Sequence, residues 1–163
     1  MTEFVVQPAR LVDVPAVVEI ERAVFSDPWS AQSFREALGH PAVYFSCARR
    51  DEGALLGYVV AWFVADEGEI ANLAVCRTAW GLGIGRALLD AALKEALSRG
   101  VTAVYLEVRE SNARARQLYH SSRFEEVGRR QGYYRRPVED AIVLRRTLDG
   151  PDKTEGELCN TTR

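Results

Sequence analysis

The sequence lacks the features that mark membrane, secreted and nucleic-acid-binding proteins. No segment reaches the roughly 18 uninterrupted apolar residues that a membrane-spanning helix needs. The first residues, Met1 to Phe4, lack the basic-then-apolar pattern of a signal peptide. A formal net charge of −2 gives the chain no overall attraction to nucleic acid. We therefore expect a cytoplasmic protein that binds neither a membrane nor nucleic acid directly.

Cysteine and histidine are too few and too scattered to indicate a disulfide framework or a metal site. The three cysteines, Cys47, Cys76 and Cys159, are odd in number, widely spaced and without paired histidines. We expect them to be reduced thiols, and we expect no metal. His40 and His120 are isolated from any nucleophile or ligand motif, so neither is assigned a role.

The composition is that of an ordinary globular domain. The chain has 163 residues, of which 47% are hydrophobic and 27% are charged, which suits one core. We expect a single domain over residues 1–148, acting as a monomer or weak dimer. Residues 149–163 carry no apolar pattern and predict a disordered tail.

Strand-like and helix-like segments alternate along this domain. Asp13 and Ser30 are the predicted caps of the first two helices, and the third helix should stop at Gly100. A fourth helix is predicted over 112–122. Strands are predicted over 4–7, 43–50, 54–64, 101–108, 125–130 and 141–147, with one more ending at Val75. This order predicts an α/β fold with a mixed, mostly antiparallel sheet of about seven strands flanked by four helices.

A glycine-rich segment between a predicted strand and a predicted helix is the strongest functional signal. The strand ends in Asn72-Leu73-Ala74-Val75, and Gly81-Leu82-Gly83-Ile84-Gly85-Arg86 leads into the helix. Glycine lets the backbone approach a ligand closely, and the N–H groups and dipole of a helix start favour an anion. The segment therefore predicts a phosphorylated ligand, with a glycine-rich turn that binds nothing as the alternative.

Two common phosphate-binding motifs do not fit this segment. The dinucleotide motif needs a third glycine where Arg86 or Leu88 stands, and the P-loop needs a lysine that no glycine here precedes. The segment instead resembles the pyrophosphate loop of the GNAT acetyltransferases, Gln/Arg-x-x-Gly-x-Gly/Ala, which ends here in Gly83, Ile84 and Gly85. Trp80 stands where that family has Gln or Arg. The departure removes one side-chain contact but leaves the backbone N–H groups available.

Further segments resemble the RimI family of protein N-terminal acetyltransferases within that superfamily, and this resemblance covers residues 4–147. They are Asp27-Pro28-Trp29-Ser30, Asn72 to Val75, Leu106 to Asn112, Leu118-Tyr119, Gly132-Tyr133-Tyr134 and Glu139 to Ile142. The resemblance implies the GNAT fold and transfer of the acetyl group of acetyl-CoA to the α-amine of a protein N-terminus. Alanine of a small-subunit ribosomal protein is the implied target. Arg123 departs from the family, which usually closes the preceding helix with glycine.

The same resemblance assigns the binding of acetyl-CoA. Backbone of Leu73, Ala74 and Val75 is expected to hold the pantetheine arm and to polarise the thioester carbonyl. The pyrophosphate is expected at Gly81, Leu82, Gly83, Ile84, Gly85 and Arg86. Asn112 aligns with a coenzyme contact of the family, but its side chain could equally be only a helix N-cap.

Glu107 and Tyr119 align with the family's general base and general acid. Glu107 has no cationic neighbour in the sequence except Arg109, so we expect partial burial to increase its basicity. The base has to remove a proton from only part of the substrate, because roughly one α-amine in six is already neutral at pH 7. Glu69 is the alternative base. Tyr119 is expected to give the departing thiolate a strong hydrogen bond. A solvated carboxylate and a packed aromatic ring are the structural alternatives.

Five residues are expected to line the peptide groove, although the aromatic ones could also belong to the core. They are Phe25, Trp29, Tyr133, Tyr134 and Glu139. Two other functions stay open. One is a GNAT enzyme for a small amine such as a polyamine, an aminoglycoside or a metabolite. The other is a non-catalytic acyl-CoA-binding protein, which would tolerate loss of Glu107 and Tyr119.

Overall fold

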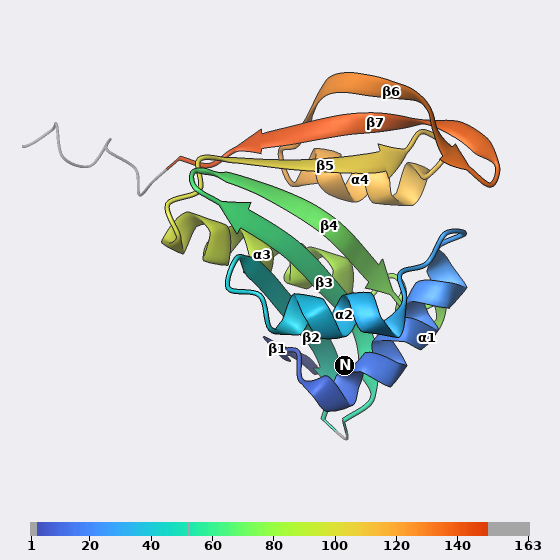
Figure 1. Cartoon of the computed structure of the whole chain (residues 1–163), viewed down its shortest axis with the longest axis vertical. Coiled ribbons are helices and arrows are strands. Elements are labelled where there is room, and N and C mark those ends of the chain that lie inside the picture. Colours follow the sequence, from blue (N-terminus) through green and yellow to red (C-terminus); the bar gives the residue numbers. More distant parts are fainter. Residues whose placement is uncertain (1–2, 52, 150–163) are drawn as a thin grey trace, which may run out of the picture.

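The alternating segments form one mixed sheet with two helices on each face. The computed structural model describes residues 3–51 and 53–149, so the predicted tail, apart from Asp149, and Cys159 lie outside the described residues. The elements are β1 (Phe4–Pro8), η1 (Leu11–Asp13), α1 (Val14–Val24), α2 (Ala31–Leu38), β2 (Val43–Arg50), β3 (Leu55–Val64), β4 (Glu67–Val75), η2 (Arg77–Ala79), α3 (Ile84–Ser98), β5 (Ala103–Arg109), α4 (Ala113–Ser121), β6 (Glu125–Arg135) and β7 (Val138–Thr147). The seven strands lie in the order β1-β2-β3-β4-β5-β7-β6, which confirms the predicted fold class (Figure 1).

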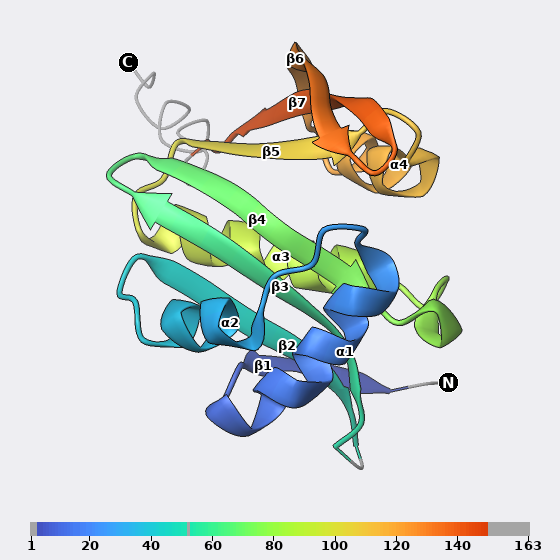
Figure 2. The ribbon, with the colours of Figure 1, turned by 45° about the vertical axis from the view of Figure 1, so that its right-hand side comes forward.

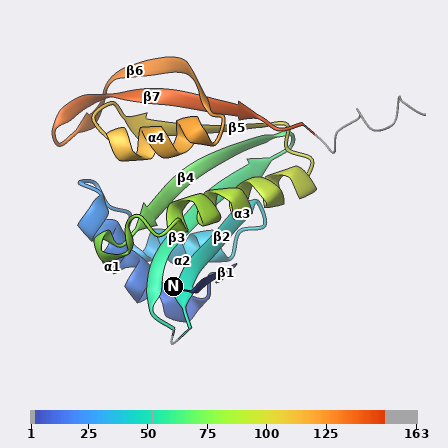
Figure 3. The ribbon, with the colours of Figure 1, turned by 180° about the vertical axis from the view of Figure 1, so that it is seen from behind.

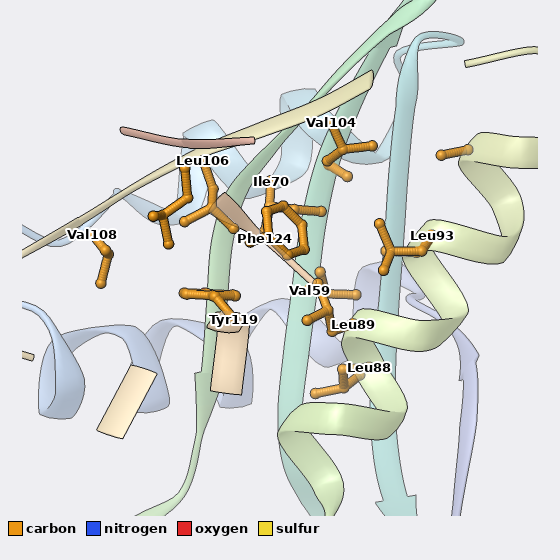
Figure 4. Close-up of a cluster of buried hydrophobic side chains, with 14 of the residues drawn as sticks. Val59, Ile70, Leu88, Leu89, Leu93, Val104, Leu106, Val108, Tyr119 and Phe124 are labelled. Atoms are coloured by element: carbon orange, nitrogen blue, oxygen red, sulfur yellow. The ribbon is translucent and has the colours of Figure 1, made fainter. Parts of the chain in front are cut away.

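Each face of the sheet has its own hydrophobic core. Helices α1 and α2 cover one face, where Val17 and Phe34 pack on Tyr58 and Val60. Helices α3 and α4 cover the other face, as the view from behind shows (Figure 3). There, Leu88, Leu89 and Leu93 of α3 pack against the central strands (Figure 4). The strand residues in this core include Val59, Ile70, Val104 and Leu106.

Strands β4 and β5 form the only parallel pair of the described sheet, and they separate halfway along (Figures 1 and 2). Their register runs from Glu67 opposite Ala103 to Ile70 opposite Leu106 and then ends. A register shift between Val60 and Ala61 of β3 coincides with the separation, because it leaves Ala71 of β4 as an extra residue. Past this point, residues 72–75 pair with β3 but not with β5, which continues along β7. The sheet therefore opens at the ends of the two strands.

Several element boundaries differ from the predicted ones. Ser30 caps α2 as predicted, with its hydroxyl accepting from the Ser33 N–H. Asp13 is the N-cap residue of α1, as predicted, but its carboxylate makes no capping bond to that helix and instead forms a buried ion pair with Arg49. Strands β6 and β7 are longer than predicted, reaching Arg135 and starting at Val138. The two strands stay paired beyond Gly132, a residue that weakens a strand, because β6 accommodates it in a bulge.

None of the described helices is long and apolar enough to cross a membrane. Cys47 and Cys76 are free thiols, and Cys47 is fully buried. The part of the chain that the structure describes holds no group of three or more His, Cys, Asp or Glu residues placed to bind a metal ion.

Candidate active site

The separated end of β4 offers backbone rather than side chains to a ligand. Leu73 and Val75 pack against the core on the α3 side, and Ala74 packs against the core on the α1 side. The strand edge that faced β5 in the paired half is left without a strand partner there. One carbonyl in this stretch is already occupied, since the indole N–H of Trp80 donates to the Val75 oxygen at 3.0 Å.

The glycine-rich segment has the conformation of an anion-binding helix start. Gly81 and Gly83 have φ angles of +80° and +81°, and Gly83 is the N-cap of α3. No heavy atom lies within 4 Å of a Cβ built on either residue, so the space above the loop is open. The first N–H groups of α3 have no acceptor within the helix and can bind an anion. Ile84 is buried, so only its backbone is available.

Arginine side chains surround this loop and supply the charge that Trp80 does not. The Trp80 ring lies 4.3 Å from the guanidinium carbon of Arg114 and 5.9 Å from that of Arg77. Arg86 donates to the hydroxyl of Ser121 on α4. Three guanidinium groups therefore lie beside the loop, and their charge favours a pyrophosphate at the start of α3.

Glu107 lies where β4 and β5 separate, on the face of β5 opposite α3 and α4. Its neighbours Leu106 and Val108 point into the α3-side core, so the alternation of the strand turns Glu107 to the other face. The side chain is 19% exposed and forms an ion pair with Arg130 of β6, with Nε and Oε1 2.9 Å apart. The expectation that Arg109 is the one cationic neighbour of Glu107 was wrong. Arg109 instead pairs with Glu139, at 3.3 Å.

The alternative base, Glu69, lies close to Glu107. Burial, together with the negative charge of Glu107, raises the pKa of Glu69, and Arg130 partly opposes the rise. A hydrogen bond to Glu107 raises the pKa of Tyr133. The two candidate bases, one arginine and one tyrosine thus form a single electrostatic cluster at the mouth of the opening.

Tyr119 lies on the opposite side of the sheet from Glu107. It belongs to the α3-side core, with 7% of its surface exposed, and packs edge-on against Phe124 with ring centres 5.7 Å apart (Figure 4). Burial raises the pKa of its hydroxyl, and nearby Tyr134 adds to the rise. No described residue forms a hydrogen bond with that hydroxyl. The packed-aromatic alternative is therefore correct for the ring, while the hydroxyl remains free to act as a donor.

Four of the five predicted groove residues are tied together by Arg109 or pack on the adjoining core. The guanidinium of Arg109 lies 4.2 Å from the centre of the Tyr134 ring, and Tyr133 packs edge-on against Tyr134. Glu139 accepts from the N–H and hydroxyl of Ser111, and these bonds, with Arg109, lower its pKa. The half-buried Trp29 packs on Phe34 at 5.4 Å.

The remaining predicted residues have mixed environments. Phe25 is half-buried against the α1-side core, so the core alternative applies to it in part, as it does to Trp29. The Asn112 side chain accepts from the Ala115 N–H at 3.1 Å, which confirms that it caps α4; its coenzyme contact stays a prediction. A surface pocket between α4 and the β6–β7 pair contains none of the predicted site residues. Its lining residues are Ala113, Arg116, Gln117, His120, Phe124, Glu126, Ile142 and Leu144.

Two buried polar residues near the opening were given no role by the sequence analysis, although Asn72 stands in one of the segments that it quoted. Glu21 of α1 is 1% exposed and accepts hydrogen bonds from the Tyr58 hydroxyl and, at 2.8 Å, from the Asn72 amide. Their signal was present in the sequence, because Glu21 continues the apolar stripe of Val14, Val17 and Val18 at helical spacing. Asn72 similarly takes a buried position in an otherwise apolar strand end.

Comparisons with known proteins agree with this geometry. The profile of the acetyltransferase (GNAT) family matches residues 14–124. The chain is 36% identical over 136 residues to a ribosomal protein bS18-alanine N-acetyltransferase of Escherichia coli, with 81% of this chain and 89% of that protein covered. The crystal structure of the ribosomal-protein-S18-alanine N-acetyltransferase of Escherichia coli superposes with a TM-score of 0.83 at 29% identity, covering 93% of this chain and 97% of that one.

The fold is also shared with a more distant structure. Arabidopsis thaliana NAA60 in complex with acetyl-CoA superposes with a TM-score of 0.82 at 22% identity, covering 91% of this chain and 100% of that one. At this identity the likeness concerns the fold alone.

Proposed function

Because the chain belongs to the acetyltransferase (GNAT) family, we propose that its opened sheet transfers the acetyl group of acetyl-CoA to the α-amine of a protein N-terminus. The enzyme is an N-acetyltransferase, and acetyl-CoA is its cosubstrate. One acetyltransferase domain over residues 1–148 would carry the whole site, because each site residue named above comes from the same chain. We propose that it acts as a monomer or weak dimer.

The observation that supports this function best is the separation of β4 from β5 between two different chemical environments. On one face lie Glu107 and Glu69, beside Arg130 and Tyr133. On the other face lies Tyr119, on the same side as the glycine-rich start of α3. An amine and a phosphorylated thioester could thus approach the opening from opposite faces.

The residues on each face have separate tasks in the proposed reaction. Acetyl-CoA supplies the acetyl group as a thioester. The N–H groups at Gly83 to Arg86 bind the pyrophosphate, and backbone of residues 73–75 holds the chain that follows it. Glu107 accepts the proton that the α-amine loses as its nitrogen bonds to the acetyl carbon. When the carbon–sulfur bond breaks, the Tyr119 hydroxyl stabilises the thiolate with a hydrogen bond.

We infer that the substrate is a protein N-terminus beginning with alanine, and that a ribosomal protein is the natural target. Relatives named as bS18-alanine N-acetyltransferases support this substrate, since the chain is 36% identical to one of them. An α-amine with a pKa near 7.7 is partly neutral at pH 7, whereas a lysine near 10.4 is almost fully charged, so an α-amine needs less help from a base. A ribosomal target would place the activity in the cytoplasm.

Mass spectrometry of defined peptides tests this function. A peptide with an N-terminal alanine and an internal lysine should gain one acetyl group, on the α-amine, in the presence of acetyl-CoA. The same peptide with a blocked N-terminus is the matched control and should stay unmodified. Acetylation of the lysine, or of polyamines and aminoglycosides but no peptide, would contradict the proposal. Incubation with cell extract would then identify the protein N-termini that are modified.

A further inference from the structure

Glu21 is a buried carboxylate without a cationic partner among the described residues. Asp13, the other buried carboxylate in this region, is ion-paired with Arg49, and its pKa is lowered. Glu21 has only neutral donors around it, and burial raises its pKa to about 7 although hydrogen bonds from Trp29 and Asn72 act against the rise. Burying an unpaired carboxylate is costly, so a group kept in this state needs an explanation beyond packing.

The three donors to Glu21 come from three different segments. The Tyr58 hydroxyl belongs to β3, and the Asn72 amide belongs to β4. The third donor is the backbone N–H of Trp29, 3.3 Å from the carboxylate, in the connection between α1 and α2. One side chain of α1 therefore holds two central strands and the following loop in fixed positions relative to one another.

Two of these donors lie at the candidate active site. Asn72 comes two residues after Ile70, the last residue of β4 that pairs with β5, so it is at the start of the separated stretch. Trp29 belongs to the segment 25–30 that is expected to form one wall of the peptide groove. The carboxylate of Glu21 thus joins the strand expected to hold the acetyl donor to the loop expected to hold the peptide.

The Asn72 amide is oriented by Glu21 alone among the described residues. Its nitrogen donates to Glu21, while its oxygen is buried without a hydrogen-bond partner. A carboxylate can only accept, so it selects the orientation in which the amide nitrogen faces α1. An uncharged carboxyl group must donate its proton, and the acceptors it can reach are the Tyr58 oxygen and, after the amide turns round, the Asn72 oxygen. Either change disturbs this set of hydrogen bonds.

We propose that Glu21 is a positioning residue for acetyl transfer, whose carboxylate holds the segment 25–30 against the separated end of β4. The proposal rests on the proposed function, since it concerns how the peptide is placed beside the acetyl donor. Glu21 is 1% exposed, so it acts through the residues that it binds and not by touching a substrate itself. Its loss should therefore weaken peptide binding and leave acetyl-CoA binding intact.

Steady-state kinetics with an N-terminal alanine peptide provide the first test. Glu21→Leu removes every acceptor and should raise the peptide KM about tenfold, with the acetyl-CoA KM changed by less than about twofold. Glu21→Gln keeps one acceptor oxygen and should restore most of the peptide affinity. The matched control is Val60→Ala, which loosens the same core opposite Asn72 without removing a polar contact. That variant should leave both KM values nearly unchanged.

Hydrogen exchange provides a test that needs no enzymatic activity. In Glu21→Leu, the amide of Trp29, which donates to this carboxylate, should exchange about tenfold faster than in the wild type, while the amides of α3 stay protected. If Glu21→Leu does not fold, Asn72→Ser decides in its place, because it removes the link to β4 and keeps the carboxylate. Equal changes in both KM values in either variant, or unchanged exchange of the Trp29 amide in a folded Glu21→Leu, would overturn the proposal. A protein without transferase activity but with the expected exchange would refute only the proposed function.

Discussion

The Nε atom of Arg130 lies 2.9 Å from Oε1 of Glu107, across a sheet in which β7 separates their two strands. The ion pair holds the carboxylate of the proposed base in one position. Replacing Arg130 with glutamine removes this contact and should lower kcat/KM for an N-terminal alanine peptide. Because Arg130 is 59% exposed, solvent screening should keep the loss below about fivefold.

The control for Arg130 is the neighbouring residue on β6. Arg129 is also partly exposed and pairs with Glu110 and Glu126, but not with Glu107. Arg129→Gln should leave kcat/KM unchanged. An equal loss in both variants would indicate a general charge effect instead of a contact with the base.

The two carboxylates at the opening can be separated by their response to pH. Glu107→Gln should lose most activity near neutral pH and recover part of it between about pH 8 and 9, where the α-amine deprotonates unaided. Glu69→Gln should keep most activity near neutral pH, because it leaves the Glu107 carboxylate and its contact with Arg130 in place. Measurement of kcat/KM from pH 6 to 9.5 tests both variants. A near-normal Glu107→Gln beside a folded, inactive Glu69→Gln would transfer the base role to Glu69.

Gly83 and Gly100 offer a matched pair for the pyrophosphate loop. Both have a φ of +81°, and neither has an atom within 4 Å of an added Cβ, but Gly100 lies at the far end of α3. Alanine at either position should cost a similar free energy of unfolding, on the order of 1 kcal/mol. Only Gly83→Ala should weaken acetyl-CoA binding in calorimetry. Equal affinity in the two variants would exclude this loop as the pyrophosphate site.

Arg123 carries a backbone strain that glycine would relieve. Its φ is +66°, in the left-handed region that the family's glycine would adopt without cost, and its side chain is exposed. Arg123→Gly should raise the free energy of unfolding by about 1 kcal/mol. Urea unfolding would measure this, and a loss of stability would show that contacts of the arginine outweigh the strain.

The fold and the glycine loop could be predicted because their signals are local. Ser30 caps its helix and Gly83 starts α3 through bonds that lie within a few residues. Contacts between distant segments could not be predicted in this way. Arg130 reaches Glu107 only because β6 and β7 fold back beside β5. The Asp13 carboxylate likewise pairs with Arg49, which is 36 residues away in the sequence. Glu21 has the same explanation, since its partners lie on β3 and β4.

Glu21 should also make the stability of the protein depend on pH. Its pKa is about 7 in the folded protein, against 4.5 for an unperturbed glutamate, so the folded protein holds a proton that the unfolded chain releases. The stability from this proton is complete below about pH 4.5 and is lost as pH rises through about 7, a decline of about 3 kcal/mol. Asp13 has the opposite effect on stability. Because its pKa is lowered in the folded protein, its contribution is lost only as the pH falls into the acid range.

Glu21→Gln isolates this contribution because it removes the titration and keeps the size of the side chain. Urea unfolding at pH 5, 6, 7 and 8 should show the wild type losing stability relative to the variant as the pH rises. Glu69 titrates with the same sign but is present in both proteins, so the difference belongs to Glu21. Two parallel curves would mean that Glu21 stays charged throughout this range, and the carboxylate would then hold Trp29 and Asn72 at every pH tested.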